Sequence, residues 1–303
     1  MSPTPSIVVG VDAGGSVFRA LVLDGGGAEL ARQEAPSARV LAGAPEPVVE
    51  ALRALIGQAC LQAGVALPVS AVWAGIAGAG RESVRAELES ALAHAGVARR
   101  VGVGTDVEAA FEDAFGSGSG ILLMSGTGSI ALGRAEDGRE GRVGGWGSVL
   151  GDEGSGYAIG VDALKRVARS HDGRARPTAL TGRLLTRLGL AAPDELITWA
   201  ASAPRPAIAA LVPEVEAAAA EGDMAAGEIL SKAVEDLEGH VLTVLQTLGP
   251  WQGFPTVALG GGLLQKGGPL RPPVEHLLQL HNLPFLGRDL DPARGAAQRA
   301  LAL

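Results

Sequence analysis

The middle of the chain contains the sequence Gly120-Ile-Leu-Leu-Met-Ser-Gly-Thr-Gly-Ser129, which predicts a strand, a tight turn and a second strand. Residues 121–124 form an apolar run short enough for a buried strand, and residues 130–132 predict the next strand. The two glycines of the turn let its backbone approach a ligand closely. Because the amides and hydroxyls of such a turn can donate to an anion, it predicts a phosphate-binding hairpin. An ordinary hairpin turn explains these five residues equally well.

The N-terminal part of the chain follows the same plan. Residues 7–11 and 18–23 predict strands on either side of the turn Asp12-Ala-Gly-Gly-Ser16, and residues 28–33 predict a third strand. An aspartate beside two glycines at the end of a buried strand can hold a hydrated Mg²⁺ that faces phosphates. Alternatively, Asp12 only helps to form the turn.

These two similar beginnings suggest two structurally related halves, each supplying one phosphate loop. The sequence Gly116-Ser-Gly-Ser-Gly120 between them is flexible and predicts a domain boundary. We therefore expect an N-terminal domain over residues 1–116 and a C-terminal domain over residues 117–289.

The order of elements in the first half predicts an α/β fold. After the three strands come expected helices and strands in alternation, over residues 47–63, 69–76, 82–95, 101–104 and 107–115. This order places an antiparallel edge on a sheet whose other strands are joined by helical crossovers. Ligands of such sheets bind at the carboxyl ends of the strands, where both Asp12 and Asp106 lie.

Asp106 directly follows the strand expected over residues 101–104. A carboxylate in this place can accept the proton of a hydroxyl that attacks a phosphate. Alternatively, Asp106 caps the helix that follows it, a role that Thr105 can share. The sequence leaves both roles open.

The segment from Gly144 to Ser155 combines five glycines with Trp146 and the acidic pair Asp152-Glu153. Such a density of glycine permits unusual backbone angles and close approach to a ligand. Adjacent carboxylates can bind vicinal hydroxyls, which favours a ligand-binding role over a purely structural Ω-loop.

The C-terminal half is expected to be mostly helical over residues 178–248, and its last part, residues 217–248, is expected to be one long helical stretch with suspected interruptions near Gly222 and Gly227. A buried strand over residues 256–259 then leads into Gly260-Gly-Gly262, which gives a ligand access to the backbone. Two further helices are expected, over residues 272–280 and 291–300.

Composition excludes several classes of protein. A formal net charge of −8 argues against nucleic acid as a partner. The single cysteine, Cys60, excludes an intrachain disulfide or a thiolate metal cluster. No apolar run reaches the roughly 20 residues of a membrane helix, and the N-terminus does not resemble a signal peptide. We therefore expect a cytoplasmic protein without membrane or nucleic-acid partners.

The chain contains the three glycine turns, Gly104-Thr-Asp106, and the sequence Gly144-Gly-Trp-Gly147 followed by Leu150-Gly-Asp-Glu-Gly-Ser155. Taken together, and in the order in which they occur along the chain, these motifs resemble the BadF/BadG/BcrA/BcrD-type ATPase family. Within it, the chain is similar to the N-acetylglucosamine and glucosamine kinases. The resemblance implies two actin-like domains around a nucleotide-binding cleft, with the C-terminal helix of residues 290–303 returning to the first domain. It also implies ATP, Mg²⁺, an amino-sugar substrate and a homodimer.

Carried over by position, the resemblance gives Mg²⁺ to Asp12 and the role of general base to Asp106. The residues that it assigns to ATP are Gly14, Gly15, Ser16, Gly126, Thr127, Gly128, Gly227, Gly261 and Gln265. The residues that it assigns to the sugar are Ser37, Asp106, Gly145, Trp146, Gly147 and Asp152.

The chain departs from the family's pattern after the first phosphate loop, where Val17 replaces the usual lysine or arginine. The expected activity is ATP-dependent phosphorylation of the 6-hydroxyl of N-acetylglucosamine or glucosamine. The alternative is an actin-like ATPase switch or regulatory nucleotide-binding protein, which the departure at Ser16-Val17 favours. Cys60 alone offers no ligand set for the iron–sulfur cluster of the family's dehydratase activators.

Overall fold

The computed structural model describes residues 6–15, 17–38 and 43–303. The chain divides into two compact units, Met1–Gly118 with Leu290–Leu303, and Ser119–Asp289. The first unit thus contains both ends of the chain. Ser16, expected in the first phosphate loop, lies outside the described residues.

The first unit contains a five-stranded mixed sheet in the order β3-β2-β1-β4-β5. β1 to β3 form an antiparallel meander, and β4 and β5 run parallel to β1. Its strands are β1 (Ile7–Ala13), β2 (Val17–Asp24), β3 (Glu29–Pro36), β4 (Val69–Ile76) and β5 (Ala98–Gly104). The expected antiparallel edge on an α/β sheet is confirmed.

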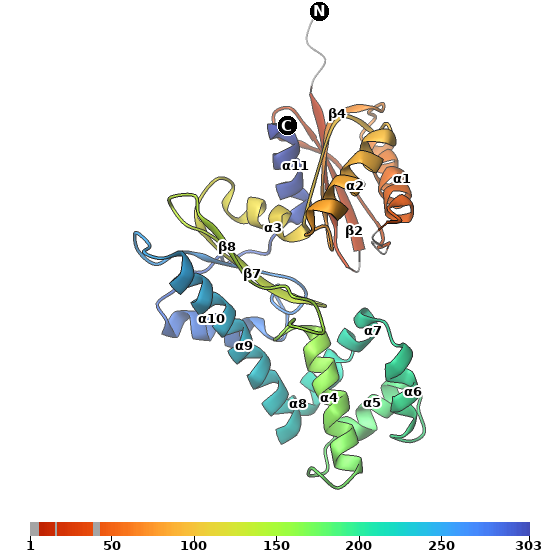
Figure 1. The fold of residues 1–303 in the computed structure, drawn as a ribbon, viewed down its shortest axis with the longest axis vertical. Helices are drawn as coiled ribbons and strands as arrows, with labels where there is room; N and C mark the ends of the chain where they lie inside the picture. Colours follow the sequence, from red (N-terminus) through yellow and green to blue (C-terminus); the bar gives the residue numbers. More distant parts are fainter. Residues whose placement is uncertain (1–5, 16, 39–42) are drawn as a thin grey trace, which may run out of the picture. The chain divides into compact units, whose positions relative to one another are not determined.

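Helices cover both faces of this sheet (Figure 1). α1 (Glu46–Gln62) and α2 (Glu82–His94) pack on one face, where Cys60 is a buried free thiol of the core, as expected. α3 (Asp106–Phe115) and α11 (Pro292–Ala302) pack on the other face. α11 lies so close that a Cβ at Gly10 would be 2.1 Å from the backbone nitrogen of Ala297. Only glycine permits this contact between strand and helix.

The second unit contains a four-stranded sheet in the order β8-β7-β6-β9. Its strands are β6 (Gly120–Ser125), β7 (Ser129–Arg134), β8 (Glu140–Gly144) and β9 (Val257–Gly260). β6 and β7 form the expected hairpin, with Ser125 opposite Ser129. β8 was not expected, because its sequence Glu-Gly-Arg-Val-Gly has little β propensity. Its antiparallel pairing with β7 at the sheet edge accounts for it.

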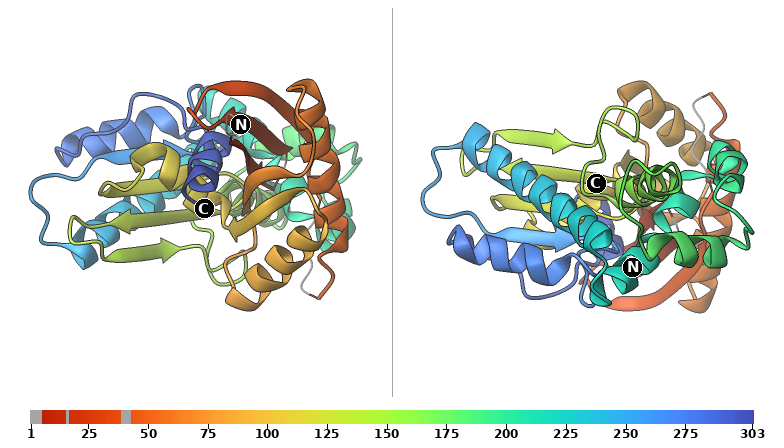
Figure 2. Two further views of the ribbon diagram at one scale, coloured as in Figure 1. Left: turned by 90° about the horizontal axis from the view of Figure 1, so that it is seen from above. Right: turned by 90° about the horizontal axis from the view of Figure 1, so that it is seen from below.

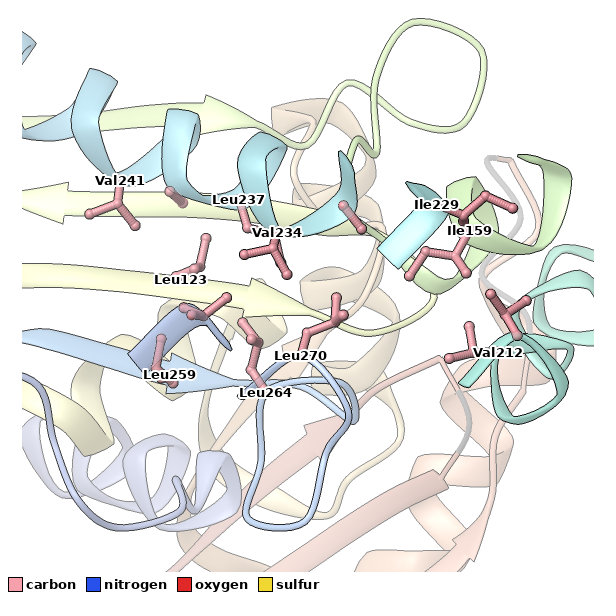
Figure 3. Close-up of a cluster of buried hydrophobic side chains, with 14 of the residues drawn as sticks. Leu123, Ile159, Val212, Ile229, Val234, Leu237, Val241, Leu259, Leu264 and Leu270 are labelled. Atoms are coloured by element: carbon pink, nitrogen blue, oxygen red, sulfur yellow. The ribbon is translucent and has the colours of Figure 1, made fainter. Parts of the chain in front are cut away.

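The long helix α9 (Met224–Leu248) runs along the sheet of the second unit (Figure 2). Its side chains, among them Leu237 and Val241, form one apolar core with Leu123 of β6 and Leu259 of β9 (Figure 3). The other helices are α4 (Gly156–His171), α5 (Leu180–Leu188), α6 (Glu195–Ser202), α7 (Arg205–Ala209), α8 (Val212–Ala220) and α10 (Arg271–Leu280).

The helical stretch expected from residue 217 to 248 is divided between two helices. α8 ends at Ala220, Gly222 adopts a φ of +89°, and Asp223 caps α9 through a hydrogen bond from the Ala226 amide. Gly227, the second suspected interruption, lies within the first turns of α9. Among the described residues, no helix combines the length and apolar character that crossing a membrane requires.

Candidate active site

Asp12 lies near the carboxyl end of β1, opposite Arg19 of β2 and Gly75 of β4. Its side chain is buried, with only 5% of the residue exposed. An Arg19 Nη1 atom lies 3.4 Å from Asp12 Oδ2, and Arg19 also donates to Glu34. A cation therefore faces Asp12 from β2, two residues beyond Val17, where the family usually has a basic residue.

The electrostatics of Asp12 suit a site for a cation. Burial, reinforced by the charge of Asp106, raises the pKa of Asp12 to about 7, against the opposing effect of Arg19. Among the described residues, no group of three or more His, Cys, Asp or Glu side chains could hold a metal ion. A single buried carboxylate such as Asp12 is a donor that Mg²⁺ can use, because this ion keeps several waters and takes one or two carboxylates together with phosphate oxygens.

Thr105, and not Asp106, caps α3. The Thr105 hydroxyl accepts from the Glu108 amide at 3.1 Å, and the Glu108 carboxylate accepts from the Thr105 amide at 2.8 Å. This capping box satisfies the first turn of the helix. The carboxylate of Asp106 at the first helical position is therefore available for another role.

The surroundings of Asp106 favour its protonated form more than those of an exposed aspartate do. Burial raises its pKa, although the backbone amide of Val107 acts in the opposite direction. Gly104, two residues earlier, leaves space beside the cap, since a Cβ there would lie 2.2 Å from Glu108 Oε2 and 2.4 Å from the Trp73 ring. The glycine at the end of β5 thus makes room for a cap that does not use the Asp106 carboxylate.

The turn of the second unit is anchored by hydrogen bonds from the side chains of Ser125 and Ser129, which flank it. Gly126 N donates to Gly128 O at 2.9 Å across the turn. The hydroxyl of Ser125 donates to Gly154 O at 2.8 Å, and that of Ser129 to Glu153 O at 2.6 Å. Both serines are buried, so they fix the turn to the segment of residues 144–155. Thr127 lies between the two glycines at the tip.

Asp152, expected to contact the sugar, lies next to this turn. It is 3% exposed and has a φ of +64°, which is unusual for a residue other than glycine. Its Oδ1 atom accepts from the Ser129 amide at 3.4 Å, and a Cβ at Gly128 would lie 2.8 Å from it. Its Oδ2 atom is paired with Arg205.

Arg205 is a site residue that the sequence analysis missed. It begins the short helix α7, its side chain is 45% exposed, and its guanidinium lies 5.6 Å from the centre of the Tyr157 ring. A lone arginine between two prolines carries no pattern that indicates a site. Its pairing with Asp152 depends on a contact between residues 53 positions apart.

The expected sugar residues Gly145, Trp146 and Gly147 begin the same segment. Gly145 and Gly147 have φ values of +69° and +80°, so their conformations favour glycine. Trp146 between them is 65% exposed, and the Arg142 guanidinium lies 5.4 Å from its ring centre. Gly145 N donates to Ser129 O at 3.0 Å, which places this segment beside the turn.

The loop after β9 also packs against the turn. Gly261 has a φ of +85°, and a Cβ there would lie 2.3 Å from Ser125 O. Gln265 N donates to Gly261 O at 2.9 Å, and the Gln265 side chain is exposed. Gly227, which was also expected near the nucleoside, is not joined to Gly261, Gln265 or the turn by any hydrogen bond in the described part of the chain.

The remaining expected residues lie in the first unit. Gly14 and Gly15 follow β1, and the Ser37 hydroxyl donates to Gly15 O at 3.2 Å. Two groups of expected residues thus form, one around Asp12 and Asp106, and one around the turn of the second unit.

Comparisons with known proteins agree with these motifs. The sequence model of the BadF/BadG/BcrA/BcrD ATPase family matches residues 9–272. An N-acetylmuramic acid/N-acetylglucosamine kinase of Clostridium acetobutylicum is 32% identical over 260 residues, which are 85% of each chain. An N-acetyl-D-glucosamine kinase of Dictyostelium discoideum is 30% identical over 97% of this chain and 98% of its own.

A solved structure shows the same likeness. A protein of Chromobacterium violaceum assigned to the N-acetylglucosamine kinases has a TM-score of 0.83 and 28% identity over 99% of this chain and 100% of its own. The expected actin-like fold is thereby confirmed. The family match spans most of the chain, and the chain belongs to the BadF/BadG/BcrA/BcrD ATPase family.

Proposed function

We propose that this protein is an ATP-dependent kinase that phosphorylates the 6-hydroxyl of N-acetylglucosamine or glucosamine. The kinases named among its relatives support an amino sugar as the substrate. The observation that carries the proposal is the capping of α3 by Thr105, because the cap does not use the Asp106 carboxylate, which follows the carboxyl end of β5.

Asp106 is proposed as the general base. Its carboxylate accepts the proton of the sugar hydroxyl as that oxygen attacks the γ-phosphorus of ATP. A pKa raised by burial strengthens the base, because a catalytic pKa works best near the operating pH. Most of the rate gain in phosphoryl transfer comes from positioning and charge stabilisation.

The phosphates are proposed to contact the backbone amides of two glycine turns. One turn contains Gly14, Gly15 and Ser16, and the other is formed by Gly126, Thr127 and Gly128. Mg²⁺, held through water by Asp12, would supply positive charge to the phosphate oxygens. Arg19 supports this arrangement because it keeps a positive charge beside Asp12 where Val17 does not.

The sugar is proposed to contact Ser37, Gly145, Trp146, Gly147 and Asp152. The exposed ring of Trp146 offers an apolar face for a pyranose, and the Asp152–Arg205 pair offers acceptors and donors for hydroxyls. The nucleoside is proposed to lie near Gly227, Gly261 and Gln265.

A coupled assay of ADP release tests this function. The purified protein is incubated with ATP and Mg²⁺ and a panel of N-acetylglucosamine, glucosamine, N-acetylmuramic acid and glucose. We expect ADP release that depends on the amino sugar, with the phosphate located on the 6-oxygen by NMR. Slow hydrolysis that is indifferent to every sugar would instead support the ATPase switch.

Two further properties follow from the proposal. A kinase that consumes ATP is expected in the cytoplasm, where ATP is abundant. The homodimer that the resemblance implies can be tested by sedimentation equilibrium, where a single species with the mass of one chain would reject it.

A further inference from the structure

We propose that His240 of α9 is a positioning residue for the segment of residues 144–155, and that it thereby sets the affinity for the sugar. This inference rests on the proposed function, because that function gives Gly145, Trp146 and Gly147 to the sugar. His240 belongs to none of the motifs that indicate the active site.

The two ends of the segment meet at Ser129, the last residue of the phosphate turn. At the first end, Gly145 N donates to Ser129 O at 3.0 Å. At the second end, the Ser129 hydroxyl donates to Glu153 O at 2.6 Å. Trp146, Val149 and Leu150, which lie between these ends, are exposed, whereas Asp152 is buried. The position of the exposed part therefore depends on how its two ends are held.

The imidazole of His240 contacts the same two ends. A Cβ at Gly144 would lie 3.0 Å from His240 Cε1, so the ring lies directly against the backbone at the first end. At the second end, His240 Nε2 lies 3.8 Å from Glu153 Oε2. One side chain of α9 therefore lies beside both ends of the segment that carries Trp146.

Packing alone does not explain a histidine at this position. Only 8% of His240 is exposed, and its Nδ1 atom is buried without a hydrogen-bond partner among the described residues. A buried polar atom without a partner destabilises the fold, and an apolar side chain would avoid that cost. The flat ring lies against Gly144, and its Nε2 atom faces the Glu153 carboxylate at 3.8 Å, where leucine would present no polar atom.

The test compares His240→Gln and His240→Leu with Val244→Ala. Val244 lies one turn further along α9 and packs on Gly133 of β7, so its truncation disturbs the same helix away from the segment. For both His240 variants we expect a KM for the sugar raised about tenfold, with the KM for ATP and kcat changed by less than about twofold. Val244→Ala should change none of the three by more than that.

An unchanged KM for the sugar in both His240 variants would overturn the inference. Similar increases in the KM values for sugar and ATP, together with a similar decrease in kcat, would overturn it too, because they would indicate general damage to the fold. Should neither variant fold, Glu153→Gln weakens the same contact from an exposed position, and the same rise in the sugar KM is expected of it.

A second readout does not depend on sugar phosphorylation. The chain has four tryptophans, and a variant with Trp73, Trp199 and Trp251 replaced by phenylalanine reports on Trp146 alone. In this background we expect His240→Gln to change the emission maximum and acrylamide quenching of Trp146. A changed signal in a protein inactive on every sugar would reject the proposed function but retain the positioning, whereas an unchanged signal would reject the positioning itself.

Discussion

At the scale of single residues, Asp12 and Asp106 are two carboxylates with different surroundings. Asp12 faces the cation Arg19, whereas the Asp106 carboxylate lies at the start of a helix whose cap is provided by Thr105. The sequence placed both residues at carboxyl ends of strands. It could not decide between capping and catalysis for Asp106, because both roles use the same residue type at the same position.

Asp106→Asn should lower kcat by about two to four orders of magnitude, since the amide cannot accept the proton of the sugar hydroxyl. ATP binding, measured by calorimetry, and the thermal midpoint should change little, because Thr105 and Glu108 still cap α3. Thr105→Ser, which keeps the capping hydroxyl, is the matched control. Turnover near that of the unaltered protein would reject Asp106 as the base.

Asp12 predicts a pH dependence of stability in the absence of Mg²⁺ and nucleotide. Its pKa in the folded protein is raised from 3.8 to about 7, so the folded state binds a proton more tightly than the unfolded state does. The contribution of Asp12 to the free energy of unfolding is therefore most favourable below about pH 4 and is lost as the pH rises to about 7.

Asp12→Asn should remove this dependence, and its free energy of unfolding relative to the unaltered protein should rise between pH 4 and 8 by at most about 4 kcal/mol. Urea unfolding at a series of pH values in EDTA measures this difference. A constant difference across that range would mean that the pKa of Asp12 is not raised.

At the scale of elements, regular patterns were predictable and contacts distant in sequence were not. The hairpin of β6 and β7 followed from an apolar run, a glycine turn and a second strand. β8 was missed because the pairing of its glycine- and charge-rich sequence with β7, not its propensity, makes it a strand. Arg205 was missed for the same kind of reason, since its role depends on contact with Asp152.

The ion pair between Arg205 and Asp152 should contribute to the binding of ATP. Arg205→Gln removes the ion pair with Asp152, whose carboxylate also accepts from Ser129 N beside Gly128. A buried carboxylate that loses its partner disfavours the folded loop, so we expect weaker ATP and sugar binding together, by about fivefold or more. Arg166→Gln, which breaks an arginine–carboxylate pair with the exposed Glu228 on α9, is the control and should leave both unchanged. Unaltered ATP binding in Arg205→Gln would show that the turn of Gly126, Thr127 and Gly128 does not depend on this ion pair.

At the scale of the whole molecule, the last residues of the chain complete the first unit. α11 packs on α3 and on β1, and its alanines share a buried cluster with Trp73 and Val8. Sequence alone predicted a final helix, and only the family resemblance suggested where it returns. Small residues explain why α11 packs so closely. Gly10 lets the backbone of β1 approach that of α11, and Gly295 lets the backbone of α11 approach that of α3, so that a single added Cβ would overlap the neighbouring backbone.

Gly295→Ala tests this closure. A Cβ at Gly295 would lie 2.0 Å from Ala109 O and 2.6 Å from Asp113 N, which are backbone atoms of α3 that cannot yield without moving the helix. Overpacking of this kind destabilises a core by about 1–3 kcal/mol. Gly287→Ala is the matched control, because no atom lies within 4 Å of its added Cβ, and it should change stability by less than about 0.5 kcal/mol. Because α3 begins at Asp106, thermal unfolding of the Gly295 variant should abolish kinase activity at the lower temperature at which the first unit melts. Equal midpoints for the two variants would mean that α11 does not hold α3 against the sheet.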